Sequence, residues 1–120
     1  MGAGEKSYNL EERTAKFGED VLDFIRKLPH DRAMDTLVRQ IVRSATSVGA
    51  NYCEANDAFT RKDFLHKISI SRKESKESKH WLRMIARAAP EFAGISRVLW
   101  QEAYELNLIF SAILRTGRNG

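Results

Sequence analysis

The chain has 120 residues, 42% of them hydrophobic and 30% charged, which suits one soluble globular domain with its own core. No run of about 18 apolar residues occurs, which argues against a membrane-spanning helix. Twenty basic residues against 16 acidic ones give a formal net charge of +4 and a pI near 9.4, a mild bias toward acidic partners such as nucleic acids. A single cysteine, Cys53, excludes an internal disulfide and fits the reducing cytoplasm.

A first helix is predicted over residues 10–28, where apolar side chains recur at steps of four and three residues. Asn9 stands where a capping side chain is expected, with Glu12 at the third helical position. The predicted buried stripe consists of Leu10, Thr14, Phe17, Val21, Phe24 and Leu28.

Two long helices are predicted next, over 32–59 after the cap Asp31 and over 61–89 after the cap Thr60 with Asp63. The first of them carries the stripe Met34, Leu37, Ile41, Ala45, Val48, Tyr52, Ala55 and Phe59. The second carries Phe64, Ile68, Ser71, Ser75, Ser78, Leu82, Ile85 and Ala89, with serine at the three central positions. A tight turn near residue 60 predicts that facing residues have numbers adding to about 120.

A fourth helix is predicted over 95–115, beyond the break at Pro90, and TGRNG is expected to be a frayed tail. No stretch alternates as a β-strand would. Four helices with short connections favour a single all-α domain, 1–120, built as an antiparallel up-down-up-down four-helix bundle.

The stretch RSATSVGANYCEA, residues 43–55, places small and polar residues at the centre of a predicted helix. Such residues suit either a buried active site or a close seam between helices, and Gly49 indicates close backbone approach. The predicted register sets Arg43 opposite Glu74 or Glu77, Asn51 near Ser69 or Ile70, and Glu54 opposite His66 or Lys67. Because small serines allow a neighbouring helix to pack closely, the seam is the favoured interpretation.

Support for an enzyme is limited to Glu77-x-x-His80, a spacing used by metal-binding helical bundles. Glu54 and Glu102 are possible additional ligands, but no second Glu-x-x-His occurs. Cys53 has no histidine nearby in sequence and is expected to be a small buried side chain. Phosphate-binding loops and nucleophile elbows are missing from the sequence, so we expect no catalysis, metal or cofactor.

A basic ridge is predicted on the third helix. Its members recur at helical spacing and consist of Arg72, Lys73, Lys76, Lys79, Arg83 and Arg87. Such a ridge can follow nucleic-acid phosphates, or it can be a solvated face partly neutralised by Glu74 and Glu77. Trp81 and Trp100 are expected to serve packing or a subunit contact rather than base stacking.

Apolar residues outside the predicted core stripes favour a symmetric assembly. These residues are Val38, Val42, Gly49 and Cys53 on the second helix, and Val98, Tyr104, Leu108 and Leu114 on the fourth.

LVRQIVRSATSVGANYCEA, followed by RKDFLHKISISRKESKESKHWLRMI, resembles the four-helix bundle proteins encoded in intervening sequences of bacterial 23S ribosomal RNA genes (S23-type). The family's motif matches Gln40, Ile41, Arg43, Ser44, Ala45, Ser47, Val48, Ala50, Asn51, Tyr52 and Glu54. Asp63-Phe64, Glu77 and Trp81-Leu82 match its later positions. Two departures are Ala55, where the family usually has Gly, and Glu74, where many relatives have Ser.

The resemblance implies a left-handed bundle that assembles as a ring, usually a pentamer, with suspected RNA or DNA binding. A more distant similarity is to the accessory variability proteins of diversity-generating retroelements, pentamers that bind nucleic acid and a reverse transcriptase. We therefore expect a non-enzymatic, cytoplasmic homo-oligomer that binds nucleic acid through the basic ridge. The alternatives are an interaction scaffold without nucleic-acid affinity and, less favoured, a metal-dependent enzyme using Glu54, Glu77 and His80.

Overall fold

Four long helices make up the computed structural model, which describes residues 9–119, with side chains described through Gly117. Their labels begin at α2, and they span Leu10–Ile25 (α2), Arg32–Asn56 (α3), Arg61–Ala88 (α4) and Ala93–Asn119 (α5). A short 3-10 turn, η1, covers Pro90–Phe92. No strand occurs among the described residues, and the prediction of an all-helical chain is confirmed. No helix between residues 9 and 119 has an apolar length sufficient to cross a bilayer.

Two of the three predicted caps form. Asp31 accepts a hydrogen bond from the Met34 amide at 2.8 Å, and Thr60 accepts one from the Asp63 amide at 3.1 Å. Asn9 stands at the N-cap position of α2 but its side chain makes no capping hydrogen bond. The predicted cap at Asn9 is therefore wrong, and α2 begins without that contribution.

The helix ends differ from the predicted bounds. α2 ends at Ile25 and α3 at Asn56, each three residues earlier than predicted. Phe59 consequently falls in the α3–α4 turn, where it is 102% exposed, and its predicted place in the core stripe is wrong. α5 begins at Ala93 and continues to Asn119, so residues 116–119 are helical rather than a frayed tail.

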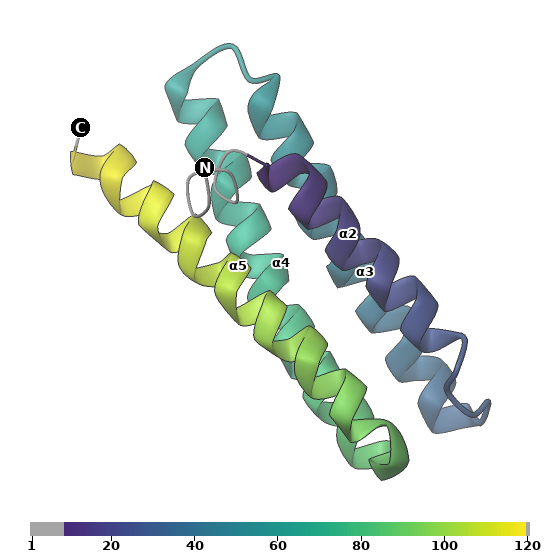
Figure 1. The fold of residues 1–120 in the computed structure, drawn as a ribbon. Coiled ribbons are helices and arrows are strands. Elements are labelled where there is room, and N and C mark those ends of the chain that lie inside the picture. Colours follow the sequence, from purple (N-terminus) through teal and green to yellow (C-terminus); the bar gives the residue numbers. More distant parts are fainter. Residues whose placement is uncertain (1–8, 120) are drawn as a thin grey trace.

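The direction of the helices follows from side chains that meet across them. Between α3 and α4, the Ser71 hydroxyl donates to the Val48 carbonyl at 2.9 Å, so the residue numbers add to about 120 as the register predicted. Between α4 and α5, the Asn107 amide donates to the Arg72 carbonyl at 2.9 Å, and here the numbers add to about 180. The Ser44–Ser78 contact repeats the first sum, and the Ser96–Leu82 contact repeats the second. A constant sum means that the two helices of each pair run in opposite directions, as Figure 1 shows.

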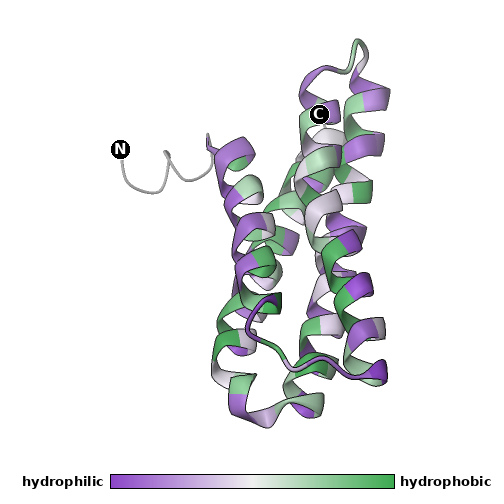
Figure 2. Cartoon of the chain, turned by 90° about the vertical axis from the view of Figure 1, so that its right-hand side faces the viewer, coloured by the Kyte–Doolittle hydropathy of each residue, from purple (hydrophilic) through white to green (hydrophobic). Residues whose placement is uncertain are grey.

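The core lies along the facing stripes of the four helices. Hydrophobic and hydrophilic residues alternate along each helix in Figure 2, as amphipathic helices require. All six residues of the predicted α2 stripe are buried. Leu114, expected outside the core, is also buried at 5% exposure. The largest fully buried side chains are Phe17, Phe24, Phe110, Met34, Ile41, Ile68, Leu82, Ile85 and Leu106.

Gly49 allows close approach of α3 to α2. A Cβ atom at this position would lie 3.1 Å from the Thr14 hydroxyl oxygen and 3.4 Å from its carbonyl carbon, which is tighter than ordinary contact. The small residues of 43–55 therefore serve two neighbours: Gly49 faces α2, whereas Ser44 faces α4.

Candidate nucleic-acid interface

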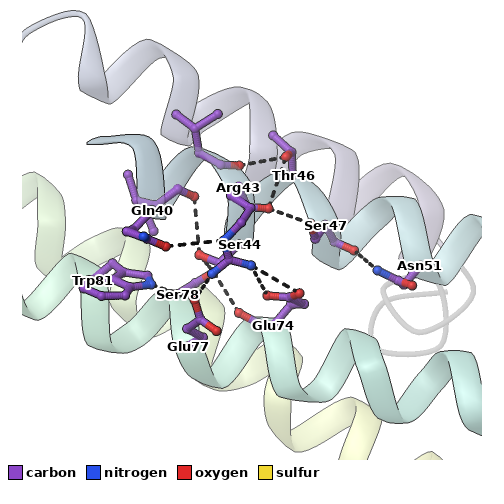
Figure 3. Close-up of polar contacts among 12 residues, drawn as sticks. Gln40, Arg43, Ser44, Thr46, Ser47, Asn51, Glu74, Glu77, Ser78 and Trp81 are labelled. Atoms are coloured by element: carbon purple, nitrogen blue, oxygen red, sulfur yellow. Dashed lines mark hydrogen bonds and ion pairs between the residues drawn. The ribbon is translucent and has the colours of Figure 1, made fainter. Parts of the chain in front are cut away.

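Arg43 lies between two carboxylates of α4. Its Nη1 atom is 3.2 Å from Glu74 Oε1, and its Nη2 atom forms an ion pair with Glu77. The indole nitrogen of Trp81 donates to Glu77 Oε2 at 2.9 Å, and all four side chains are visible in Figure 3. Glu74 is the most buried of the three charged groups, with a side-chain exposure of 16% against 46% for Arg43. The cluster therefore links α3 to α4 and satisfies both carboxylates.

The remaining residues of the predicted seam occupy different environments. Ser44 and Ser78 are fully buried, and their hydroxyl groups are 2.9 Å apart across the helix pair. Glu54 forms an ion pair with Lys67 at 2.7 Å. Asn51 was expected to face α4. Its side chain instead donates to the Ser47 carbonyl of its own helix at 2.9 Å. Asp63 is exposed in the first turn of α4.

The three central serines of α4 serve both neighbouring helices. Ser71 and Ser78 bond to α3, whereas the Ser75 hydroxyl lies 3.2 Å from the Asn107 amide of α5. Each serine is fully buried, and each hydroxyl has a partner, which avoids the cost of an unpaired buried polar group. The residues of RSATSVGANYCEA that face α4 are therefore part of a polar seam. On the α2 side of the same stretch, Thr46, Gly49, Ala50 and Cys53 line a surface pocket of about 340 Å³.

The six residues of the basic ridge lie along α4. Lys73, Lys76, Arg83 and Arg87 are exposed. Arg72 is half-buried, and its Nε atom is buried without a hydrogen-bond partner among the described residues. Lys79 is also half-buried, with its ammonium group 5.3 Å from the ring centre of Trp100 and 5.2 Å from that of Tyr104.

The charges nearest to the ridge in sequence do not neutralise it. Glu74 and Glu77 turn toward Arg43 on the α3 side. None of the six ridge residues forms an ion pair with any side chain described between residues 9 and 117. The ridge therefore keeps its positive charge for a ligand or for solvent.

Two features were missed by the sequence analysis. Arg13 of α2 binds Glu102 of α5 through two hydrogen bonds of 2.8 and 2.9 Å and contacts Glu105 at 3.0 Å. The hydrogen bond to Glu102 is the main cause that raises the pKa of Arg13, so the guanidinium stays charged. The rings of Trp100 and Tyr104 stack with centres 5.6 Å apart and planes at 10°. The four-residue spacing of Trp100 and Tyr104 on one helix could have predicted the aromatic pair. Nothing in the sequence around Arg13 or Glu102 predicts that the two residues meet.

The three carboxylates that were candidate metal ligands each form an ion pair with a different cation. Glu54 binds Lys67, Glu77 binds Arg43, and Glu102 binds Arg13. Between residues 9 and 119, no group of three His, Cys, Asp or Glu side chains has the geometry to hold a metal ion. His80 instead packs edge-on against Trp81, with ring centres 4.9 Å apart.

Cys53 is exposed rather than buried as expected. Local desolvation raises the pKa of its thiol, and the nearby Glu11 carboxylate, 3.8 Å away, raises it further. A raised pKa leaves less thiolate at neutral pH, which is the opposite of what an activated nucleophile needs.

The fold and these contacts define a small helical bundle protein with a polar α3–α4 seam and a basic α4 face. The chain belongs to the 23S rRNA-intervening sequence protein family, whose model matches residues 6–89. A solved structure of a protein with unknown function from the S23 ribosomal protein family of Bacteroides thetaiotaomicron VPI-5482 is similar to it. The two chains share 27% identity with a TM-score of 0.79, over 87% of this chain and 96% of the other. No curated protein matches the chain.

Proposed function

We propose that this chain is a non-enzymatic, homo-oligomeric bundle that binds RNA or DNA through the basic ridge of α4. One observation carries the proposal: six cationic side chains follow one helix while the neighbouring carboxylates, Glu74 and Glu77, are engaged with Arg43. At 1.5 Å per residue the ridge extends over about 22 Å, enough to contact several successive phosphates. The family description, which refers to 23S rRNA, makes a ribosomal RNA fragment the first ligand to test.

Assembly into a ring is the second part of the proposal. Four apolar side chains of α5 remain exposed, namely Val98 at 70%, Leu108 at 49%, Ile95 at 40% and Tyr104 at 37%. Burial of such side chains between copies supports a symmetric assembly. We propose a pentameric ring of left-handed, up-down-up-down bundles, located in the cytoplasm, which would repeat the basic ridge around one particle.

The exposed apolar residues of α5 also support an alternative function, a protein-interaction scaffold without nucleic-acid affinity. In that case a protein such as a reverse transcriptase is the partner, and the ridge only keeps the surface soluble. The metal-dependent enzyme has less support, because Glu54 and Glu77 each already bind a cationic side chain.

Salt-dependent binding tests the proposal. Affinity for a labelled 23S ribosomal RNA fragment is measured by fluorescence anisotropy at 50 and 200 mM salt. Release of counterions from four to six phosphates predicts a loss of about 100- to 1,000-fold between these conditions. The triple variant Lys76→Glu, Lys79→Glu, Arg83→Glu should abolish binding.

The matched control reverses three exposed charges outside α4, Arg26→Glu, Arg32→Glu and Arg39→Glu, which changes the net charge by the same amount. This control should keep salt-dependent binding. Equal loss in both triple variants would remove the ridge from the proposal. The absence of any shift at low salt would refute nucleic-acid binding and leave the scaffold.

A further inference from the structure

A surface pocket of about 450 Å³ opens at the end of the bundle where α4 passes through η1 into α5. Apolar atoms of Leu82, Ala86 and Ala93 line it, together with the indole of Trp100. Two of the lining residues are alanines, whose short side chains occupy less of the pocket than longer residues would. Its volume lies within the range of about 300–1,000 Å³ typical of small-ligand sites.

The walls of this pocket are fixed by contacts between the two helices. The hydroxyl group of Ser96, another lining residue, is buried and donates to the Leu82 carbonyl at 2.6 Å. Trp100 stacks on Tyr104 of the next helical turn. The indole is therefore held in place before any ligand arrives, which lowers the entropic cost of binding.

Two arginines give the pocket its charge. Arg83 from α4 and Arg97 from α5 both line it and both are exposed. Neither forms an ion pair with a side chain described in residues 9–117. The α5 carboxylates Glu102 and Glu105 bind Arg13 instead. An apolar pocket beside an indole and two arginines is complementary to a flat aromatic group that carries negative charge.

Lys79 adds a third cation next to the pocket without filling it. Its ammonium group lies over the Trp100 and Tyr104 rings, but the residue is not part of the pocket lining. Because Lys79 and Arg83 also belong to the basic ridge, the pocket is continuous with the proposed phosphate-binding surface.

We infer that this pocket binds one unpaired nucleotide of a single-stranded nucleic acid, with the base against Trp100 and the phosphate between Arg83 and Arg97. The inference rests on the proposed nucleic-acid function and deepens it, since it names single strands, loops and ends as the preferred ligand. Bases inside a duplex are stacked on each other and cannot enter such a pocket. Phosphates on the ridge alone would give no such preference.

The test compares three probes of one length: a single-stranded oligo(dT), an abasic single strand with the same phosphates, and a duplex. Trp100→Leu should weaken oligo(dT) binding by about 5- to 100-fold, since loss of one stacked base has this size. Binding of the abasic strand and of the duplex should change less than about twofold. Trp100→Phe, which keeps an aromatic face, should retain most of the affinity.

Arginine variants test the phosphate contacts. Arg97→Ala should weaken oligo(dT) binding more than Arg39→Ala, an equal charge change at an exposed site on α3. Equal effects of the two would overturn the assignment of the phosphate to this pocket.

Intrinsic fluorescence gives a measurement on the unchanged protein, which holds even where a variant fails to fold. Oligo(dT) should quench Trp100 emission, whereas the abasic strand should not. Trp81 supplies the background, since its indole is engaged with Glu77. Unchanged emission with bound oligo(dT) would overturn the inference.

The possible failures are distinguishable. If no probe binds the wild-type chain, the proposed function itself is wrong. If probes bind but Trp100→Leu affects all three equally or not at all, only the pocket is wrong. If Trp100→Leu alters the mass of the assembly without affecting the oligo(dT) preference, the pocket is a contact between copies, and the inference is overturned.

Discussion

Replacing Arg43 tests whether the polar seam stabilises the bundle. Arg43→Ala removes the only cation that the structure places against Glu74 and Glu77 among the described residues. Glu74 then retains a negative charge at a side-chain exposure of 16% without its partner. Loss of a partner for a partly buried charge destabilises a fold more than the loss of an exposed pair.

The size of the loss follows from the burial of the groups. An exposed ion pair contributes about 0.2–1 kcal/mol, whereas breaking a fully buried pair costs about 3–5 kcal/mol. Arg43 is 46% exposed and Glu77 31%, so this cluster lies between the two limits. We expect Arg43→Ala to lower the free energy of unfolding by about 1–2 kcal/mol, or the melting temperature by about 3–10 °C.

Arg72→Ala is the comparison. Its Nε atom is buried without a partner, so removing the guanidinium relieves an unsatisfied donor while the packing of the side-chain stem is lost. A net loss under about 1 kcal/mol is expected.

Urea unfolding followed by circular dichroism, at one fixed protein concentration, measures both variants. Neutralising the carboxylate first, with Glu74→Gln, should reduce the effect of Arg43→Ala, giving a coupling of about 0.5–2 kcal/mol in the double-mutant cycle. Equal, small losses for Arg43→Ala and Arg72→Ala, with no coupling to Glu74, would refute the seam.

Two further predictions concern α3. Gly49→Ala should lower the free energy of unfolding by about 1 kcal/mol, because the contact with Thr14 outweighs the gain in helix propensity. Gly94→Ala is the control: a Cβ atom there would have nothing within 4 Å, so the substitution should leave the free energy of unfolding unchanged or raise it. A stabilising Gly49→Ala would contradict the close approach. Cys53 alkylation by iodoacetamide should be slow at neutral pH and keep accelerating above the thiol's ordinary pKa, because desolvation and Glu11 raise that pKa. Glu11→Gln should speed the reaction at a given pH, and a rate that levels off below pH 8 would disprove the raised pKa.

Periodicity was enough to predict the helices and the α3–α4 pairing. A short turn fixes which residues of an antiparallel pair face each other, and the Glu54–Lys67 ion pair at 2.7 Å follows from it. Periodicity failed at the helix ends. Phe59 continues the α3 spacing, but α3 ends at Asn56 and the Thr60 cap starts α4, so the spacing no longer determines which side is buried.

Contacts between helices that are distant in sequence were less predictable. Arg13 and Glu102 are 89 positions apart, and no short turn fixes the register between α2 and α5. Trp100 was expected to serve packing or a subunit contact. The pocket beside it could not be predicted from the sequence, because it is lined by residues from α4 and α5 that meet only in the folded bundle.

The placement of negative charge connects the seam to the proposed function. Glu74 and Glu77 are interspersed with the basic residues of α4 in sequence, so the sequence suggests partial neutralisation. Arg43 holds both carboxylates on the α3 side, and Arg13 similarly holds Glu102 and Glu105 on the α2 side of α5. The cations of the ridge and of the Trp100 pocket form no ion pair with any of the described side chains. Arg43→Ala should consequently weaken nucleic-acid binding even where the fold survives, because the negative charges of Glu74 and Glu77 are then no longer neutralised and lie on the same helix as the ridge. Unchanged affinity in a folded Arg43→Ala variant would separate the seam from binding.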